Sequence, residues 1–264
     1  MMLWKSWRDL RVFVFVGFAW LALLSAGVLS HPHLVQTSPQ SYDSTDVIAA
    51  LMRVFLDLQT FAFAFLAWGM GTRGIGRDIG NGSGSFVLTR PARHAAFVWT
   101  EWGAGLAAIA LLLAVADLLY WGAVRLQLIR ILDLRLGPDP GYRRIWVDVA
   151  LPFHISAIAT LCAFLFVALI FSLTHLGTIV LRHSTRGLLF CIGCLIGYLI
   201  LGWEIYLHHP SWSPYYPDLL FQPFYDFPQN MNLVPDAAAS IFERLALLPL
   251  FPLIAQLTLL RAEV

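Results

Sequence analysis

Apolar stretches long enough to cross a lipid bilayer constrain this sequence more than any other feature. Residues 12–30 form a run of 19 residues without a charge, and a transmembrane helix needs about 20 predominantly apolar residues. Further stretches of this kind follow along the chain. Charged residues make up only 12% of the sequence, whereas soluble domains carry about 25%. A soluble fold would have to hide too much apolar surface, so the sequence predicts a protein embedded in lipid.

The sequence predicts an all-α, polytopic integral membrane protein with about six transmembrane helices and an N-terminal interfacial helix, in a single transmembrane domain over residues 1–264. The predicted spans are 12–30, 47–70, 98–121, 155–180, 187–207 and 241–260. The interfacial helix is predicted for residues 1–11, where Trp4, Trp7 and Leu10 repeat at helical spacing beside basic residues. The alternative is a simple basic flank of the first span.

Basic residues gather in segments that the predicted spans place on one side of the membrane. The N-terminal segment, the 71–94 and 182–186 loops and Arg261 together carry ten Lys and Arg residues. Residues 31–46 and 208–238 carry none. Because positively charged loops stay in the cytoplasm, both termini and the two basic loops are predicted to be cytoplasmic. The 208–238 segment is rich in aromatic residues and is predicted to be an outer re-entrant or interfacial segment, either gating an exit or anchoring the chain.

One predicted outer segment, 122–149, departs from this charge rule because it contains five arginines. Three aspartates partly balance them. Val124, Leu128 and Leu132 recur at helical spacing, which predicts an amphipathic helix at the outer surface.

The 71–94 loop contains the most specific motif in the chain, GRDIGNGSGSFVLTRPAR over residues 76–93. This motif resembles the loop after the second span in permease subunits of type-2 ATP-binding-cassette (ABC) exporters, the ABC-2-like membrane proteins. There, an acidic, glycine-bearing stretch precedes a pattern of leucine, threonine or serine, arginine, proline, any residue and arginine. The basic N-terminus, the six predicted spans and the long last outer loop extend the resemblance to the whole chain. The alternative is an ordinary basic loop that only sets topology.

The resemblance implies a transport function in the bacterial inner (plasma) membrane. The loop would act as a coupling loop that docks into an ABC ATPase subunit through Asp78, Phe86, Leu88, Arg90, Pro91 and Arg93. A homodimer, or a heterodimer with a second permease, would form the substrate path among membrane lipids. The chain has no ATP site of its own, because its glycine run lacks the G-K-[ST] ending of a phosphate-binding loop. No enzyme activity, catalytic residue, bound cofactor or metal is therefore expected here. ATP and Mg are expected in the partner chain, and the formal net charge of +1 suggests no nucleic acid.

Ionisable residues inside spans are costly, so each is a candidate for the translocation path or for intramembrane pairing. Arg53 and Asp57 lie four residues apart, a spacing at which they can pair on one helix face. The other candidates lie near the outer ends of their spans: Asp117, Glu204, Glu243 and Arg244. Snorkelling to the interface is the alternative for all of them.

Histidines and cysteines support rival functions. His154 and His175 share one apolar stretch, and opposed histidines bind haem in membrane cytochromes. The alternative function is therefore a membrane-anchored electron-transfer (haem) or complex-assembly subunit. The outer histidines, His31, His33, His208 and His209, have no diagnostic metal spacing. Cys191 and Cys194 form a C-x-x-C inside a span and are interpreted as packing residues. An intramembrane enzyme is a third possibility, but the sequence has no H-E-x-x-H motif.

Overall fold

The computed structural model describes residues 2–30, 59–82, 94–125, 130–136, 142–148, 153–208 and 235–261. The helices are α1 (Met2–Ser30), a helix over residues 59–71, α3 (Ile75–Gly80), α5 (His94–Arg125), α6 (Phe153–Leu181), α7 (Ser184–His208), α9 (Pro235–Leu247) and α10 (Leu250–Arg261). Two strands, β1 (Arg130–Leu136) and β2 (Tyr142–Asp148), form an antiparallel hairpin.

The predicted fold class is confirmed. Within the described residues, five stretches are long and apolar enough to cross a membrane: Trp4–Ala26, Ala95–Leu119, Thr160–Leu181, Ser184–His208 and Ile241–Arg261. They correspond to five of the six predicted spans. The remaining span was predicted at 47–70. Its described part is helical over residues 59–71.

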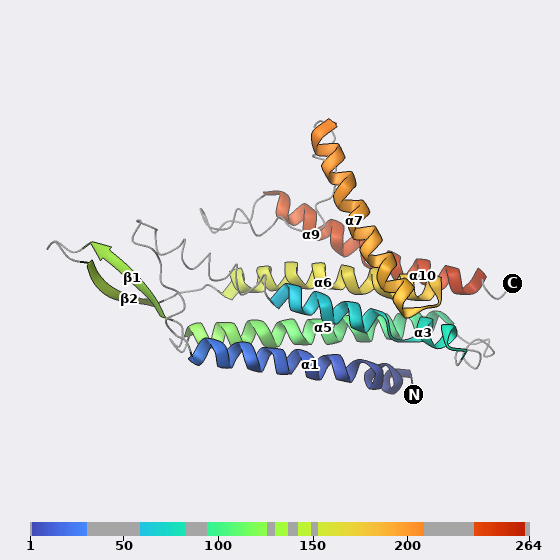
Figure 1. Ribbon diagram of the computed structural model, residues 1–264, viewed down its shortest axis with the longest axis horizontal. Coiled ribbons are helices and arrows are strands. Elements are labelled where there is room, and N and C mark those ends of the chain that lie inside the picture. The colour runs from blue at the N-terminus through green and yellow to red at the C-terminus, as the bar shows by residue number, and fades with distance from the viewer. Residues whose placement is uncertain are drawn as a thin grey trace.

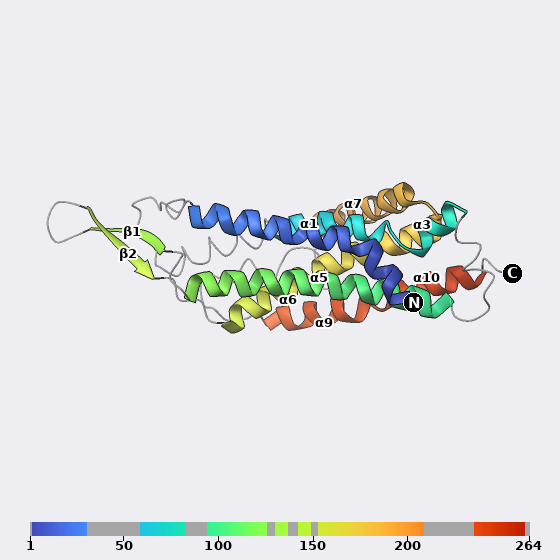
Figure 2. The ribbon, with the colours of Figure 1, turned by 90° about the horizontal axis from the view of Figure 1, so that it is seen from below.

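Helices α1, α5 and α6 lie side by side along the molecule (Figures 1 and 2), whereas α7 diverges from them (Figure 1). The N-terminus, α3, the turn between α6 and α7 and the C-terminal end of α10 all lie at one end, which we call the basic end. The β1–β2 hairpin lies at the opposite end (Figure 1). The described parts of the segments that the charge pattern assigned to one side are thus together in space.

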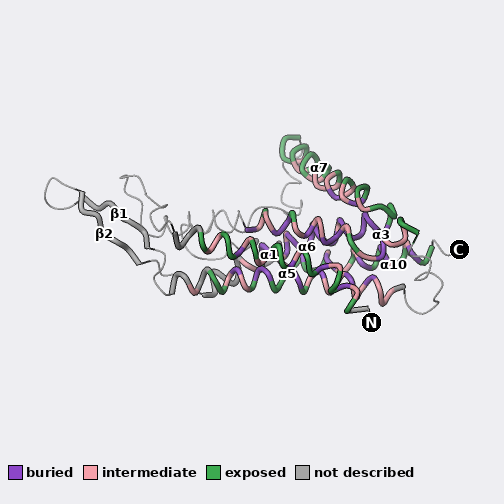
Figure 3. Tube along the Cα trace, turned by 60° about the horizontal axis from the view of Figure 1, so that its bottom comes forward, coloured by how far each residue is buried: buried purple, intermediate pink, exposed green. Residues whose placement is uncertain are grey.

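The main hydrophobic core lies between α1, the 59–71 helix, α5 and α6. Within membrane helix bundles, small residues let backbones approach closely. At Gly17 of α1, an added Cβ would lie 2.8 Å from the side chain of Leu112 in α5. Figure 3 shows that burial is concentrated on α6, whereas most of α7 is exposed. An exposed apolar helix of this length fits a surface that lipid covers.

Two predicted segments differ from the observed helices in where these begin or end. The first predicted span and the interfacial segment form one continuous helix, α1, whose first turns bend away from its axis (Figure 2). The last predicted span is interrupted between α9 and α10. Pro249 lies at this break, and proline has no N–H to continue a helical hydrogen-bond ladder.

The prediction of an amphipathic helix from Val124, Leu128 and Leu132 is wrong. Val124 belongs to α5, Leu128 lies outside the described residues, and Leu132 belongs to β1 opposite Trp146 of β2. From Leu132 onward the sequence LDLRL alternates apolar and charged residues, which is the period of a strand. The following GPDPG is typical of a turn.

Candidate functional site

The short helix α3 and its surroundings at the basic end form the candidate site. Glycine residues set both of its boundaries. Gly74 precedes α3 with a φ of 94°, and Gly82 follows it with a φ of 76°. Glycine adopts such left-handed conformations without the steric penalty that a Cβ brings. The chain therefore leaves the 59–71 helix, forms about two turns of α3 and reverses direction within a few residues.

Three charged side chains from three different helices meet at α3, and we call them the ionic cluster. Lys5 of α1 donates a hydrogen bond to Asp78 of α3. The Lys5 Nζ also lies 3.7 Å from a carboxylate oxygen of Glu101, which belongs to α5. The side chain of Glu101 is only 8% exposed, so this pairing compensates a carboxylate that would otherwise be costly to bury.

Glu101 also fixes the beginning of α3. Its Oε2 accepts a hydrogen bond of 2.8 Å from the backbone N–H of Ile75, one of the N–H groups that a helix start leaves without a partner in the helix. A Cβ at Gly74 would collide with this carboxylate. Glycine is therefore needed at position 74 both for its backbone conformation and for the close approach of Glu101.

The inner face of α3 packs directly on α6. At Gly76, an added Cβ would lie 2.6 Å from the carbonyl oxygen of Thr178 and 2.8 Å from the backbone nitrogen of Ile179. Ile75 is fully buried in a cluster with residues of α5, α6 and α10, namely Val98, Leu176, Ile179, Ala255 and Leu259. The end of α3, at Gly80, abuts the backbone of Arg182 in the α6–α7 turn.

Further hydrogen bonds join the helices around α3. Ser184, the first residue of α7, donates a hydrogen bond of 3.1 Å to the carbonyl oxygen of Thr72. The indole of Trp99 in α5 donates to Gln256 of α10 at 3.1 Å. The indole of Trp102, also in α5, donates to Ser172 of α6 at 2.9 Å. Side-chain hydrogen bonds between membrane helices contribute roughly 0.6 kcal/mol each on average, so together they reinforce the packing.

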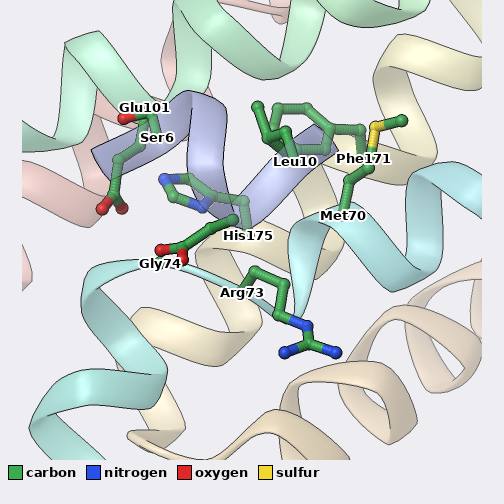
Figure 4. A pocket seen from close by; sticks show the side chains of 9 residues that line it. Ser6, Leu10, Met70, Arg73, Gly74, Glu101, Phe171 and His175 are labelled. Atoms are coloured by element: carbon green, nitrogen blue, oxygen red, sulfur yellow. The ribbon is translucent and has the colours of Figure 1, made fainter. Parts of the chain in front are cut away.

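A small cavity adjoins the ionic cluster. Its walls are Ser6, Asp9, Leu10, Met70, Arg73, Gly74, Glu101, Phe171 and His175. Figure 4 shows the His175 ring between Ser6 and Glu101 on one side and Leu10 and Phe171 on the other. The cavity therefore has a polar and an apolar wall, and it lies where α1, α5 and α6 meet the segment that precedes α3.

The structure places some of the predicted site residues. Asp78 lies in α3 and joins the ionic cluster. The five other predicted coupling residues, together with Arg53 and Asp57, lie outside the described residues: Phe86, Leu88, Arg90, Pro91 and Arg93. Gly82 has the left-handed conformation expected of a chain reversal, whereas Gly80 lies within α3 and serves packing instead.

The predicted intramembrane candidates have different environments. Arg244 of α9 is buried, with 2% exposure. Asp117 of α5 is half-buried, and like Arg244 it has an interaction partner. Glu243 is exposed, and Glu204 is exposed with its carboxylate 3.5 Å from His208 on the same helix. Arg244 therefore fits intramembrane pairing, while Glu204 and Glu243 face outward from this chain.

The sequence does not single out Lys5, Glu101 and His175 as neighbours of α3. Lys5 lies in the interfacial helix predicted for residues 1–11, with a basic flank of the first span as the alternative, and Glu101 lies in the predicted span 98–121. An acidic residue inside a predicted span is a signal that its carboxylate needs a partner. The sequence could not identify that partner, because Lys5 and Asp78 are 73 residues apart in the chain.

The cysteines behave as packing residues. The Cys191 thiol is buried, accepts a hydrogen bond of 3.1 Å from the Trp68 indole and thereby joins α7 to the 59–71 helix. Cys194 is half-buried, and both cysteines are free. Within the described ranges, no three His, Cys, Asp or Glu residues come together in a way that could hold a metal ion.

The comparisons with known proteins give no family. No protein-family model matches the sequence, and no curated protein matches it significantly.

Proposed function

We propose that this chain is the permease subunit of an ATP-driven ABC exporter, and that α3 transmits movements of a separate ATPase subunit to the membrane helices. The observation that carries this proposal is the position of α3. It lies outside the predicted span-length helices, at the basic end, and it contacts α1, α5, α6, α10 and the α6–α7 turn. A motion applied to α3 would therefore reach most of the bundle at once.

The contacts of α3 hold it at several positions, as this role requires. A helix of two turns has little stability of its own in water, so it transmits force only if its surroundings hold it. Glu101 fixes its first N–H group, Lys5 fixes Asp78, and Gly76 places its backbone against α6. The fixed positions lie at its beginning, middle and inner face, which favours movement of α3 as one body with its neighbours.

The outer side of this region is available to a partner. Gly80, Asn81 and Gly82 are exposed, and the chain continues from them into the segment with the arginine–proline motif. Arg90 and Arg93 in that segment would pair with acidic groups of the ATPase, while Phe86 and Leu88 would fill apolar pockets. In this proposal the chain lies in a bacterial inner membrane, and its basic end is on the cytoplasmic side. ATP and Mg bind to the partner ATPase. A second permease completes the substrate path.

Purification of the tagged chain from native membranes tests the proposal. We expect a vanadate-sensitive ATPase activity to accompany the full-length protein. The double substitution Arg90→Glu with Arg93→Glu should abolish this association by charge repulsion. The matched control, Arg143→Glu with Arg144→Glu, reverses two charges in β2 at the opposite end and should leave the association intact.

Two outcomes would refute the proposal: no ATPase accompanies the wild-type protein, or the Arg90 and Arg93 reversal leaves the associated activity unchanged. An absorbance spectrum of the same preparation adds an independent observation. A Soret band would favour the electron-transfer alternative instead.

A further inference from the structure

The inference concerns the His175 side chain and the cavity beside it. His175 is 3% exposed, and its Nε2 atom has no hydrogen-bond partner. Within the described part of the chain, Trp20 Nε1 is the other buried side-chain atom in this condition. A buried polar atom without a partner costs about 1–3 kcal/mol, and at His175 the adjoining cavity has room for a compensating group.

The surroundings of His175 limit what that group can be. Its ring is stacked on Phe171, one turn earlier in α6, with ring centroids 5.8 Å apart and planes 13° apart. Phe171 thus occupies one ring face and offers no hydrogen bond in the ring plane. Besides His175, the polar side chains that line the cavity are those of Ser6, Asp9, Arg73 and Glu101. Figure 4 shows the Arg73 guanidinium pointing away from the imidazole.

The size of the cavity suits a single water molecule. Its volume is about 20 Å³, and a single water molecule requires about 10–15 Å³ by this measure. Buried water occupies sites that are both roomy enough and polar, with two to four partners. This cavity meets both conditions, because the side chains of His175, Ser6, Asp9 and Glu101 line it.

We propose that the cavity is a hydration site, in which one ordered water molecule hydrogen-bonds to His175 Nε2 and to polar groups of α1 and α5. Either tautomer of a neutral imidazole can take part, because water both donates and accepts. The water would extend the ionic cluster of Lys5, Asp78 and Glu101 to a fourth helix, α6. This inference does not depend on the export function.

Solid-state NMR on the wild-type protein in liposomes tests the proposal, with ¹⁵N in the histidine and tryptophan side chains. Magnetisation transferred from water should reach the His175 side-chain nitrogens rapidly. Trp20 Nε1 provides the internal control, because it is buried and unpaired but does not line this cavity. Its signal should build up several-fold more slowly. The variants His175→Gln and Trp20→Phe serve only to assign the two signals.

Equal build-up at His175 and Trp20 would overturn the hydration site. A density map of the wild-type protein, at a resolution that shows other buried waters, gives a second measurement that needs no variant. It should show a peak about 2.7–3.2 Å from Nε2, and an empty cavity in such a map would also overturn the proposal.

Discussion

At the scale of single residues, Glu101 performs two tasks that are normally separate. It neutralises Lys5, and it accepts the first N–H of α3. Asp78 shares the same lysine, but its side chain is 28% exposed, against 8% for Glu101. Burial makes the loss of Glu101 more serious, because water can replace an exposed partner and cannot easily replace a buried one.

We therefore predict unequal effects of two substitutions in the ionic cluster. Glu101→Ala should lower the free energy of unfolding by about 2–4 kcal/mol, since it leaves both the Ile75 N–H and the Lys5 ammonium without this partner. Asp78→Asn should cost less than about 1 kcal/mol, as for a partly exposed ion pair. Thermal unfolding in detergent, followed by tryptophan fluorescence, measures both. A larger effect of Asp78→Asn would contradict the ranking.

The sequence identified one member of this cluster and missed the others. Asp78 was recognisable because it lies in a loop with a motif. Lys5 belongs to the predicted interfacial helix and Glu101 to the predicted span 98–121, and nothing in a single sequence indicates that the two meet at one loop. The His175 ring was weighed only as a haem ligand, because the cavity that gives it another role depends on packing between helices.

At the scale of elements, glycine determines how closely α3 can approach α6. Gly76 touches the α6 backbone at Thr178 and Ile179. Gly193 of α7 gives the opposite case, because an added Cβ there meets nothing within 4 Å. Both glycines lie in helices, so the helix-propensity gain from alanine is similar at the two positions, and the contacts alone distinguish them.

We predict that Gly76→Ala destabilises the protein by about 1–3 kcal/mol, the usual cost of forcing an extra methyl group into tight packing. Gly193→Ala should be neutral or slightly stabilising. The two variants can be compared by their melting temperatures in the same detergent. Equal melting temperatures would show that α3 is not packed against α6 in the way described.

Apolar length predicted the membrane helices well, since the cost of placing polar groups in lipid leaves few alternatives. Local detail within the spans was harder to predict. Pro249 is compatible with either one kinked helix or two separate helices. Packing against neighbouring helices decides between the two, and a single sequence does not show that packing. The β1–β2 hairpin was missed because three residues at helical spacing received more weight than the strict alternation from Leu132 to Leu136.

At the scale of the whole molecule, the basic segments form one pole. Arg73, Arg182, Arg186 and Arg261 are exposed there, near the start of α1. The hairpin, with four arginines of its own, occupies the other pole. The positive-inside rule weighs charges close to the spans, and on this basis we predict that the pole with α3 faces the cytoplasm.

We predict the corresponding labelling pattern in intact cells. A membrane-impermeant maleimide should label a cysteine introduced by Arg135→Cys in β1, and should label Asn81→Cys only after the cells are opened. The native cysteines, two buried and one half-buried, provide the background in the unsubstituted protein. Labelling of Asn81→Cys from outside would place α3 on the external face and exclude a cytoplasmic ATPase as its partner.

The divergence of α7 from the bundle has a consequence for the surrounding lipid. Gly177 and Gly187 let α6 and α7 cross closely near the basic end, and beyond that point Ile196, Ile200 and Trp203 of α7 are exposed. Its 25 residues extend about 37 Å, more than the roughly 30 Å of hydrocarbon in a typical bilayer. A helix that is held at one end and is longer than the hydrocarbon layer is thick must tilt to keep its apolar residues in lipid. Thinner membranes should increase the tilt of α7 and thicker membranes should decrease it, with the crossing at Gly177 as the point about which α7 rotates.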